Sequence, residues 1–136
     1  AKLMAHCQNR LSTTVLMVRP AGAPHGWEQT DLWRSASVIP GVNVVVDEHG
    51  QESRLLGAST SGQTLLYSAE GRMLFAGGIT ASRGHSGDSA GHSFIRSVVL
   101  GEIESDPEAP VRTPVYGCAL FTPLTSGEES EETCCK

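Results

Sequence analysis

The stretch that decides the fold is TLLYSAEGRMLFAGGITASRGHSGDSAGHSFIRSVVL, residues 64–100. Two short apolar runs, residues 64–67 and 73–76, flank a polar turn that contains glycine, which predicts a β-hairpin. A polar, glycine-rich segment follows. Apolar residues then recur at helical spacing after Asp88 or Ser89, either of which is a good N-cap. The stretch therefore predicts strand, strand, glycine-rich loop and helix, and we expect any function to lie in the loop.

Upstream of this stretch, the pattern predicts a β-α-β unit. Residues 15–19 and 42–46 are nearly continuous apolar runs rich in β-branched side chains, as in buried strands. Residues 28–39 carry apolar side chains on one helical face, and a Pro-Gly pair ends that pattern. A crossover of this kind is right-handed and makes the two strands parallel. We expect one or two further helical turns over residues 51–56.

The remaining segments have weaker patterns. Residues 1–5 predict a short strand, residues 102–114 a linker rich in proline and charge, and residues 115–120 an apolar island that packs back on the body. Residues 1–121 therefore form one α/β domain, with a single mixed sheet and flanking helices. Residues 122–136 form an acidic tail without periodicity, which predicts disorder.

The composition limits the partners that the chain can have. Its 136 residues are 39% hydrophobic, enough for one modest core. No apolar run approaches the roughly 20 residues of a membrane span, so no transmembrane segment is expected. The net charge of −5 is uneven: residues 1–101 hold eight Lys or Arg and seven Asp or Glu, whereas residues 102–136 hold two and eight. A near-neutral body with an acidic tail argues against nucleic acid as a partner.

One serine has the neighbours of a catalytic nucleophile. Residues 87–91, GDSAG, resemble the serine motif of trypsin-like proteases, and the run Ala5-His6-Cys7 resembles their histidine motif. A triad also needs an orienting carboxylate, and the chain lacks the strands of two barrels. A G-x-S-x-G elbow needs a strand that runs directly into the serine, which the predicted strands do not supply. We therefore interpret Ser89 as a helix N-cap.

The glycine-rich loop is a candidate binding site. Backbone N–H groups at a helix N-terminus favour anions, and Arg83 adds a full positive charge. The candidate binding residues are Arg83, Gly84, His85 and Asp88. The alternative is a structural loop, in which the glycines serve only the backbone conformation.

Cys7 is the strongest candidate for chemistry. A thiol beside His6 can have a lowered pKa and react as the thiolate, with Cys118 as its partner. The alternative is that Cys7 is a small buried hydrophobe. The ligand types also suit a soft-metal site. Its candidate ligands are His6, Cys7, His85 and Cys118. We interpret the remaining histidines as solvated, namely His25, His49 and His92.

Three segments together resemble a known family. They read IPGVNVVVD (39–47), LLGASTSGQTLLYSAEGRMLFAGGITASRGHSGDSAG (55–91) and TPVYGCALF (113–121). On these segments, residues 15–121 resemble the RedB-type proteins, which are bacterial thioredoxin-like redox proteins. The resemblance implies a thioredoxin-like fold and a thiol or disulfide substrate that is a protein or a small molecule. It also implies a periplasmic or exported location, with the cytoplasm as the alternative. We expect no cofactor.

The chain departs from that family near its N-terminal side. Such relatives carry a cysteine pair after the first strand, whereas this chain has Cys7 alone. Only seven residues separate Cys7 from Val15, too few for the long helix that should follow, so the first helix is truncated or altered. Residues 60–63, where thioredoxins place a cis-proline, contain no proline. Disulfide exchange through a local two-cysteine motif is therefore not available.

Two functions follow from these observations. The first is a thiol-disulfide oxidoreductase in which Cys7 attacks as the thiolate and Cys118 resolves the product. The second is a non-catalytic binding module on a thioredoxin-like scaffold, in which the glycine-rich loop of residues 77–91 contacts a small anion, a soft metal ion or a protein partner. The missing second cysteine and the missing proline favour the second.

Overall fold

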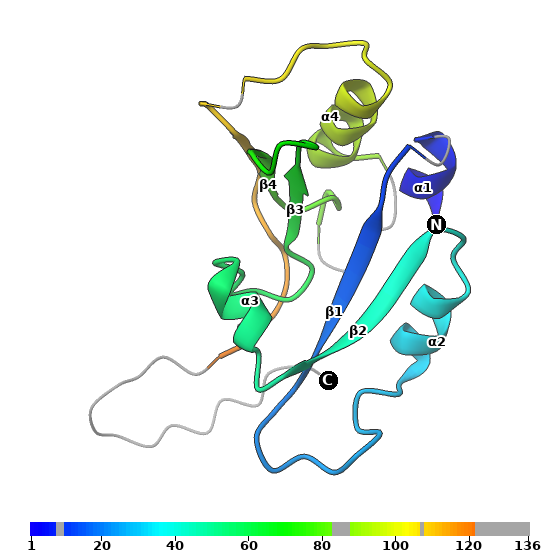
Figure 1. The fold of residues 1–136 in the computed structure, drawn as a ribbon, viewed down its shortest axis with the longest axis vertical. Coiled ribbons are helices and arrows are strands. Elements are labelled where there is room, and N and C mark those ends of the chain that lie inside the picture. Colours follow the sequence, from blue (N-terminus) through cyan, green and yellow to red (C-terminus); the bar gives the residue numbers. More distant parts are fainter. Residues whose placement is uncertain (8–9, 83–87, 107, 122–136) are drawn as a thin grey trace.

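The computed structural model describes residues 1–7, 10–82, 88–106 and 108–121. These ranges form a mixed α/β fold with helices flanking the strands, as the sequence predicts (Figure 1). The helices are α1 (Lys2–His6), α2 (Asp31–Ser37), α3 (Gln51–Leu55) and α4 (Ala90–Val99). The strands are β1 (Thr13–Arg19), β2 (Val42–Glu48), β3 (Thr64–Tyr67), β4 (Met73–Gly77) and β5 (Val111–Arg112).

The predicted β-α-β unit is confirmed. β1 and β2 pair in parallel without a register shift, from Thr13 opposite Val42 to Arg19 opposite Glu48. Their β-branched side chains suit a pleated, half-buried surface. α2 connects the two strands and packs against β2. The helix ends at Ser37, with Val38 as its C-cap and Pro40, which cannot continue a helix, two residues beyond.

The predicted hairpin is also confirmed. β3 and β4 pair antiparallel, with Thr64 opposite Gly77 and a register shift between Leu66 and Tyr67. β5 then pairs in parallel with β4, with Phe75 opposite Val111. β5 lies inside the segment expected to be a linker, so that expectation was incomplete. A strand as short as β5 leaves almost no periodic pattern in the sequence.

The expectation of one continuous sheet was wrong. The structure has a two-stranded sheet of order β1-β2 and a separate three-stranded sheet of order β3-β4-β5. β3 is only four residues long and shifts register within that length, so it offers little regular edge for β1 to pair with. Figure 1 shows the two sheets as distinct bodies of strands, with α3 at one end of the first.

The expected strand at residues 1–5 was also wrong, because this segment forms α1. The N–H of Ala5 donates to Ala1 O at 3.1 Å and that of Cys7 to Leu3 O at 2.9 Å. Lysine, leucine, methionine and alanine are all good helix formers, so local propensity favours this helix. α1 buries Met4 and packs against α4.

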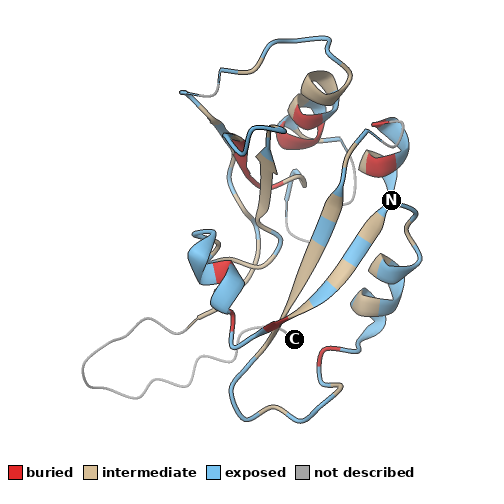
Figure 2. Ribbon diagram, viewed as in Figure 1, coloured by how far each residue is buried: buried red, intermediate tan, exposed pale blue. Residues whose placement is uncertain are grey.

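The core is small and centred on β4 and α4. Its hydrophobic residues that are less than a tenth exposed are Met4, Cys7, Leu74, Phe75, Ala76 and Ile95. Figure 2 shows these buried positions gathered around β4, α4 and α1, whereas β1 and β2 are mostly half-buried. Phe75 stacks on Phe94 with ring centroids 5.9 Å apart, which joins the sheet to the helix.

The apolar segment of residues 115–120 packs back on the body, as predicted. Ser61 N–H donates to Cys118 O and Leu120 N–H to Ser59 O, each at 2.8 Å. Phe121 then lies beneath the guanidinium of Arg54, 3.9 Å from the ring centroid. Within the described residues, no helix has the length and apolar character needed to cross a membrane.

Candidate functional site

The first turn of α4 is where the glycine-rich segment enters a helix. Ser89 has an extended backbone, with φ −137° and ψ 164°, and its hydroxyl accepts the N–H of His92 at 3.1 Å. This is the geometry of an N-cap, so the interpretation of Ser89 as a cap is confirmed. The hydroxyl is committed to the helix backbone.

Two more N–H groups of this turn, those of Ala90 and Gly91, have no hydrogen-bond partner within the described ranges. The first N–H groups of any α-helix lack partners inside the helix and carry the positive end of its dipole. Gly91 is buried because the Gly78 carbonyl and the Phe75 ring occupy the space that a Cβ would need. This close approach holds the turn against the end of β4.

His92 is the third residue of α4, and its side chain is only 8% exposed. Its Nδ1 lies 4.0 Å from Oδ1 of Asp88, which precedes the helix. Its ring meets the ring of His6 edge to face, with centroids 5.4 Å apart and an interplanar angle of 81°. Its Nε2 is buried and has no hydrogen-bond partner in the part of the chain that the structure describes. A buried nitrogen without a partner costs free energy, so this atom needs a physical explanation.

The surroundings of His92 are electropositive. Burial lowers the pKa of His92, and the charges of His6, Arg96 and Lys2 lower it further, whereas Asp88 opposes them. The imidazole is therefore neutral at neutral pH. Three basic side chains and a helix N-terminus against one exposed carboxylate make a location that suits an anion.

The interpretation of His92 as a solvated residue was wrong. His92 shares a face of α4 with Ile95, three residues on, and Ile95 is 1% exposed. That spacing was readable in the sequence as part of the apolar stripe of the helix. A polar residue on such a stripe is buried with it, whatever its own preference for water.

The structure makes Cys7 a buried thiol. It is the C-cap residue of α1, it is fully buried, and it is a free cysteine. Burial raises the pKa of Cys7, and the charge of Arg96 offsets this only in part. Cys118 is disulfide-bonded, so the two sulfurs are not joined to each other in this structure.

The remaining predicted site residues fall into two groups. Asp88 lies beside the first turn of α4 and is 87% exposed. Arg83, Gly84 and His85 lie outside the described residues. The predicted metal site includes His85 and is therefore only partly described. Among the described residues, no three His, Cys, Asp or Glu side chains are grouped so that they could hold a metal ion.

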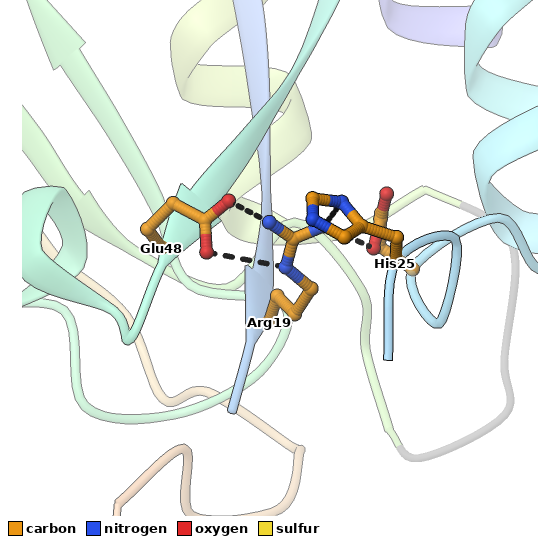
Figure 3. A network of polar contacts seen from close by, with 4 residues as sticks. Arg19, His25 and Glu48 are labelled. Atoms are coloured by element: carbon orange, nitrogen blue, oxygen red, sulfur yellow. Dashed lines mark hydrogen bonds and ion pairs between the residues drawn. The ribbon is translucent and has the colours of Figure 1, made fainter. Parts of the chain in front are cut away.

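A second polar cluster, which the sequence did not indicate, lies at the carboxyl ends of β1 and β2 (Figure 3). Arg19 makes a two-pronged ion pair with Glu48, directly opposite it in the sheet. Its Nη1 also lies 3.5 Å from Glu28 Oε2 and 3.3 Å from His25 Nδ1. Every charge in the cluster faces an opposite charge, and Arg19 is 12% exposed. We therefore assign this cluster a structural role: it holds the loop before α2 against the sheet.

Comparison of the whole chain with known protein families, with curated proteins and with solved structures finds no match in any of the three.

Proposed function

We propose that this chain is a non-catalytic binding module that holds a small oxyanion at the N-terminus of α4. The observation that carries the proposal is the buried Nε2 of His92, which has no hydrogen-bond partner among the described residues. The N–H groups of Ala90 and Gly91, in the same helical turn, have none there either. His92 is the third residue of α4, so it belongs to the same first turn as these two N–H groups. Polar groups of one helical turn that lack a partner among the described residues fit a polar ligand.

Charge favours an anion over other ligands at this turn. Lys2, His6 and Arg96 all act on His92, and the helix dipole adds a partial positive charge. Oxyanions match both features, because they carry negative charge and several acceptor oxygens.

The thiol-redox function receives less support. A reactive cysteine needs an accessible thiolate, whereas Cys7 is fully buried and burial raises its pKa. A direct check is alkylation of the intact protein at neutral pH. We expect Cys7 to react far more slowly than free cysteine and to react readily after unfolding in urea. Labelling of folded Cys7 as fast as free cysteine would restore the redox function.

The scaffold that we propose is thioredoxin-like. From β1 to α4 the elements run β-α-β-α-β-β-α, with a parallel pair followed by an antiparallel hairpin. This order agrees with the resemblance to RedB-type proteins, whereas the separation of the two sheets does not. On that resemblance, an exported location remains part of the proposal.

The oxyanion site is tested by titrating the full chain, labelled with ¹⁵N, with inorganic phosphate and with inorganic sulfate at constant ionic strength. We expect at least one of them to shift the amide signals of Ala90 and Gly91 in a saturable way. Asp88→Asn removes the described carboxylate that acts on His92 and should tighten binding about two- to fivefold. Asp31→Asn is the matched control, because Asp31 is also an exposed acid at a helix N-terminus, and it should change nothing. Absence of a saturable shift with both ions would overturn the proposal.

A further inference from the structure

α1 is a short helix that depends on its packing to stay folded. It has five residues, whereas an isolated helix shorter than about 12 residues is marginal in water. It packs against α4 (Figure 1) and buries Met4, whose sulfur accepts the Thr13 hydroxyl at 3.0 Å. Segments held by few buried apolar contacts open at lower free energy than the core, so α1 should open before the sheets do.

The Cys7 thiol is carried by this helix. Cys7 is the C-cap of α1, and its N–H donates to Leu3 O at 2.9 Å. The residue is fully buried, and the charge of Arg96 on α4 acts on its thiol, so the sulfur lies near α4. Release of α1 from α4 would therefore expose the thiol while both sheets remain folded.

Two histidines meet where α1 packs on α4. The rings of His6 and His92 are edge to face, with centroids 5.4 Å apart. The Nε2 of His92 is buried and has no hydrogen-bond partner within the described ranges. Both ring nitrogens of a protonated imidazole are donors. Whichever nitrogen holds the proton of the neutral ring, protonation of His92 would therefore leave a buried, charged N–H without a described acceptor, which is unfavourable.

The charges around His92 also oppose its protonation. Burial lowers the pKa of His92, and the charges of Lys2 and His6 on α1, and of Arg96 on α4, lower it further. Asp88, which is 87% exposed, raises it. β4 also packs against α4 but has no titratable side chain. Because two of the three basic groups belong to α1, the released state takes up a proton on His92 more readily than the packed state.

We infer that α1 is a pH-sensitive cover over Cys7: protonation of His92 releases α1 from α4 and exposes the thiol, while the two sheets stay folded. The inference goes beyond the proposed function and does not depend on oxyanion binding. A state that binds a proton more tightly is favoured as the pH falls. The open fraction should therefore rise as the pH drops below 6.5, the ordinary pKa of histidine, and level off below the lowered pKa of packed His92.

The test measures how fast Cys7 of the intact wild-type chain reacts with dithiodipyridine at about pH 7.5 and at about pH 5.5, on either side of the ordinary histidine pKa. Mass spectrometry of peptides assigns the label to Cys7. Each rate is divided by that of the urea-unfolded chain at the same pH, which removes the intrinsic pH dependence of the thiol. We expect this relative rate to be about three- to tenfold higher at the lower pH.

Low concentrations of urea distinguish local release from global unfolding. A local opening exposes little surface, so the logarithm of the relative rate should change with urea by less than about half of the slope for global unfolding. A slope equal to that of global unfolding at both pH values would overturn the inference. A relative rate that does not change with pH would overturn it as well.

Three variants identify the group that responds to pH. His92→Phe keeps a ring in the interface but cannot be protonated, so labelling of Cys7 should lose its pH dependence. His49→Asn is the matched control, because His49 is exposed and asparagine tolerates its positive φ of 56°, and it should keep that dependence. Met4→Ala loosens α1 without changing a titratable group and should raise labelling by a similar factor at both pH values. Full pH dependence in His92→Phe would overturn the assignment to His92.

Discussion

The carboxylate of Asp47 caps the helix that contains Ser53. One oxygen accepts the Ser53 N–H at 2.9 Å and the Ser53 hydroxyl at 2.6 Å, and the other accepts the Glu52 N–H at 3.0 Å. Asp47 is 1% exposed. The end of β2 is thereby fastened to the first turn of α3, which otherwise has no side-chain cap.

We predict that Asp47→Asn destabilises the fold by about 1–3 kcal/mol, because one N–H donor of the helix turn then faces an amide donor. Urea unfolding at pH 7 measures the loss. Ser53→Ala removes only the hydroxyl and should cost less. A free energy of unfolding unchanged in Asp47→Asn would show that this cap contributes nothing.

The Asp47 carboxylate should also make the protein less stable at acidic pH. Burial by itself raises the pKa of Asp47, but the hydrogen bonds from Ser53 and Glu52 and the charge of Arg54 hold it below its ordinary value of 3.8. The stabilisation is therefore present above pH 3.8 and is lost as the pH falls through the lowered pKa. The unfolding free energies of the wild type and of Asp47→Asn, measured as a function of pH, should therefore become more alike as the pH falls through that range.

His92 should make stability depend on pH in a different range. Its pKa is lowered from 6.5 in the folded state, so below pH 6.5 the unfolded chain binds more protons than the folded one. Stability should therefore fall as the pH is lowered from about 7 toward 5, in the same direction as the effect of Asp47 but at higher pH. His92→Phe should flatten this part of the urea-unfolding profile, and an equally steep profile in the variant would contradict the assignment.

Gly91→Ala should destabilise the protein by about 1–3 kcal/mol, the usual cost of forcing an extra carbon into a packed contact. The new Cβ would overlap the Gly78 carbonyl and lie 2.8 Å from Cζ of Phe75. Thermal unfolding measures the change. Ser93→Ala is the control, because Ser93 is exposed on the same helix and alanine favours helices there. Equal stability of the two variants would mean that the glycine contact can relax.

Arg19→Met should be more damaging than an ordinary loss of a surface charge. It leaves Glu28, whose side chain is 5% exposed, as a buried carboxylate without its cation. Such a loss costs about 3 kcal/mol, and Arg19→Met combined with Glu28→Gln should recover part of it. Arg34→Met is the comparison: its ion pair with Asp31 is exposed, so the cost should stay below about 1 kcal/mol.

The features that the sequence predicted correctly are those with local causes. The hairpin and the Ser89 cap depend on residues close together in the chain, and the β-α-β unit was predicted from the apolar pattern within each of its elements; all three are present. The two sheets are separate because β1 does not pair with β3, and these two strands are far apart in the chain. Periodicity carries no information about such long-range pairing.

The site was predicted only in part, for a related reason. Helix and loop patterns located the N-terminus of α4, and Asp88 lies beside it. The burial of His92 depends on α1 packing against α4, and α1 was expected to be a strand. Cys7 was singled out for reactivity because its neighbour His6 was visible in the sequence, whereas the hydrophobic contacts that enclose the thiol were not.

The C-terminal part of the described chain contacts the second sheet and then the turn and helix that follow β2. β5 extends the second sheet, residues 118–120 pair with the backbone of 59–61, and Phe121 covers Gly50 and Arg54 beyond the end of β2. The segment therefore ties the second sheet to the end of the first by non-covalent contacts, in addition to the covalent connection through residues 49–63. We expect a protease cut between residues 100 and 110 to weaken this tie and so to reduce the cooperativity of unfolding.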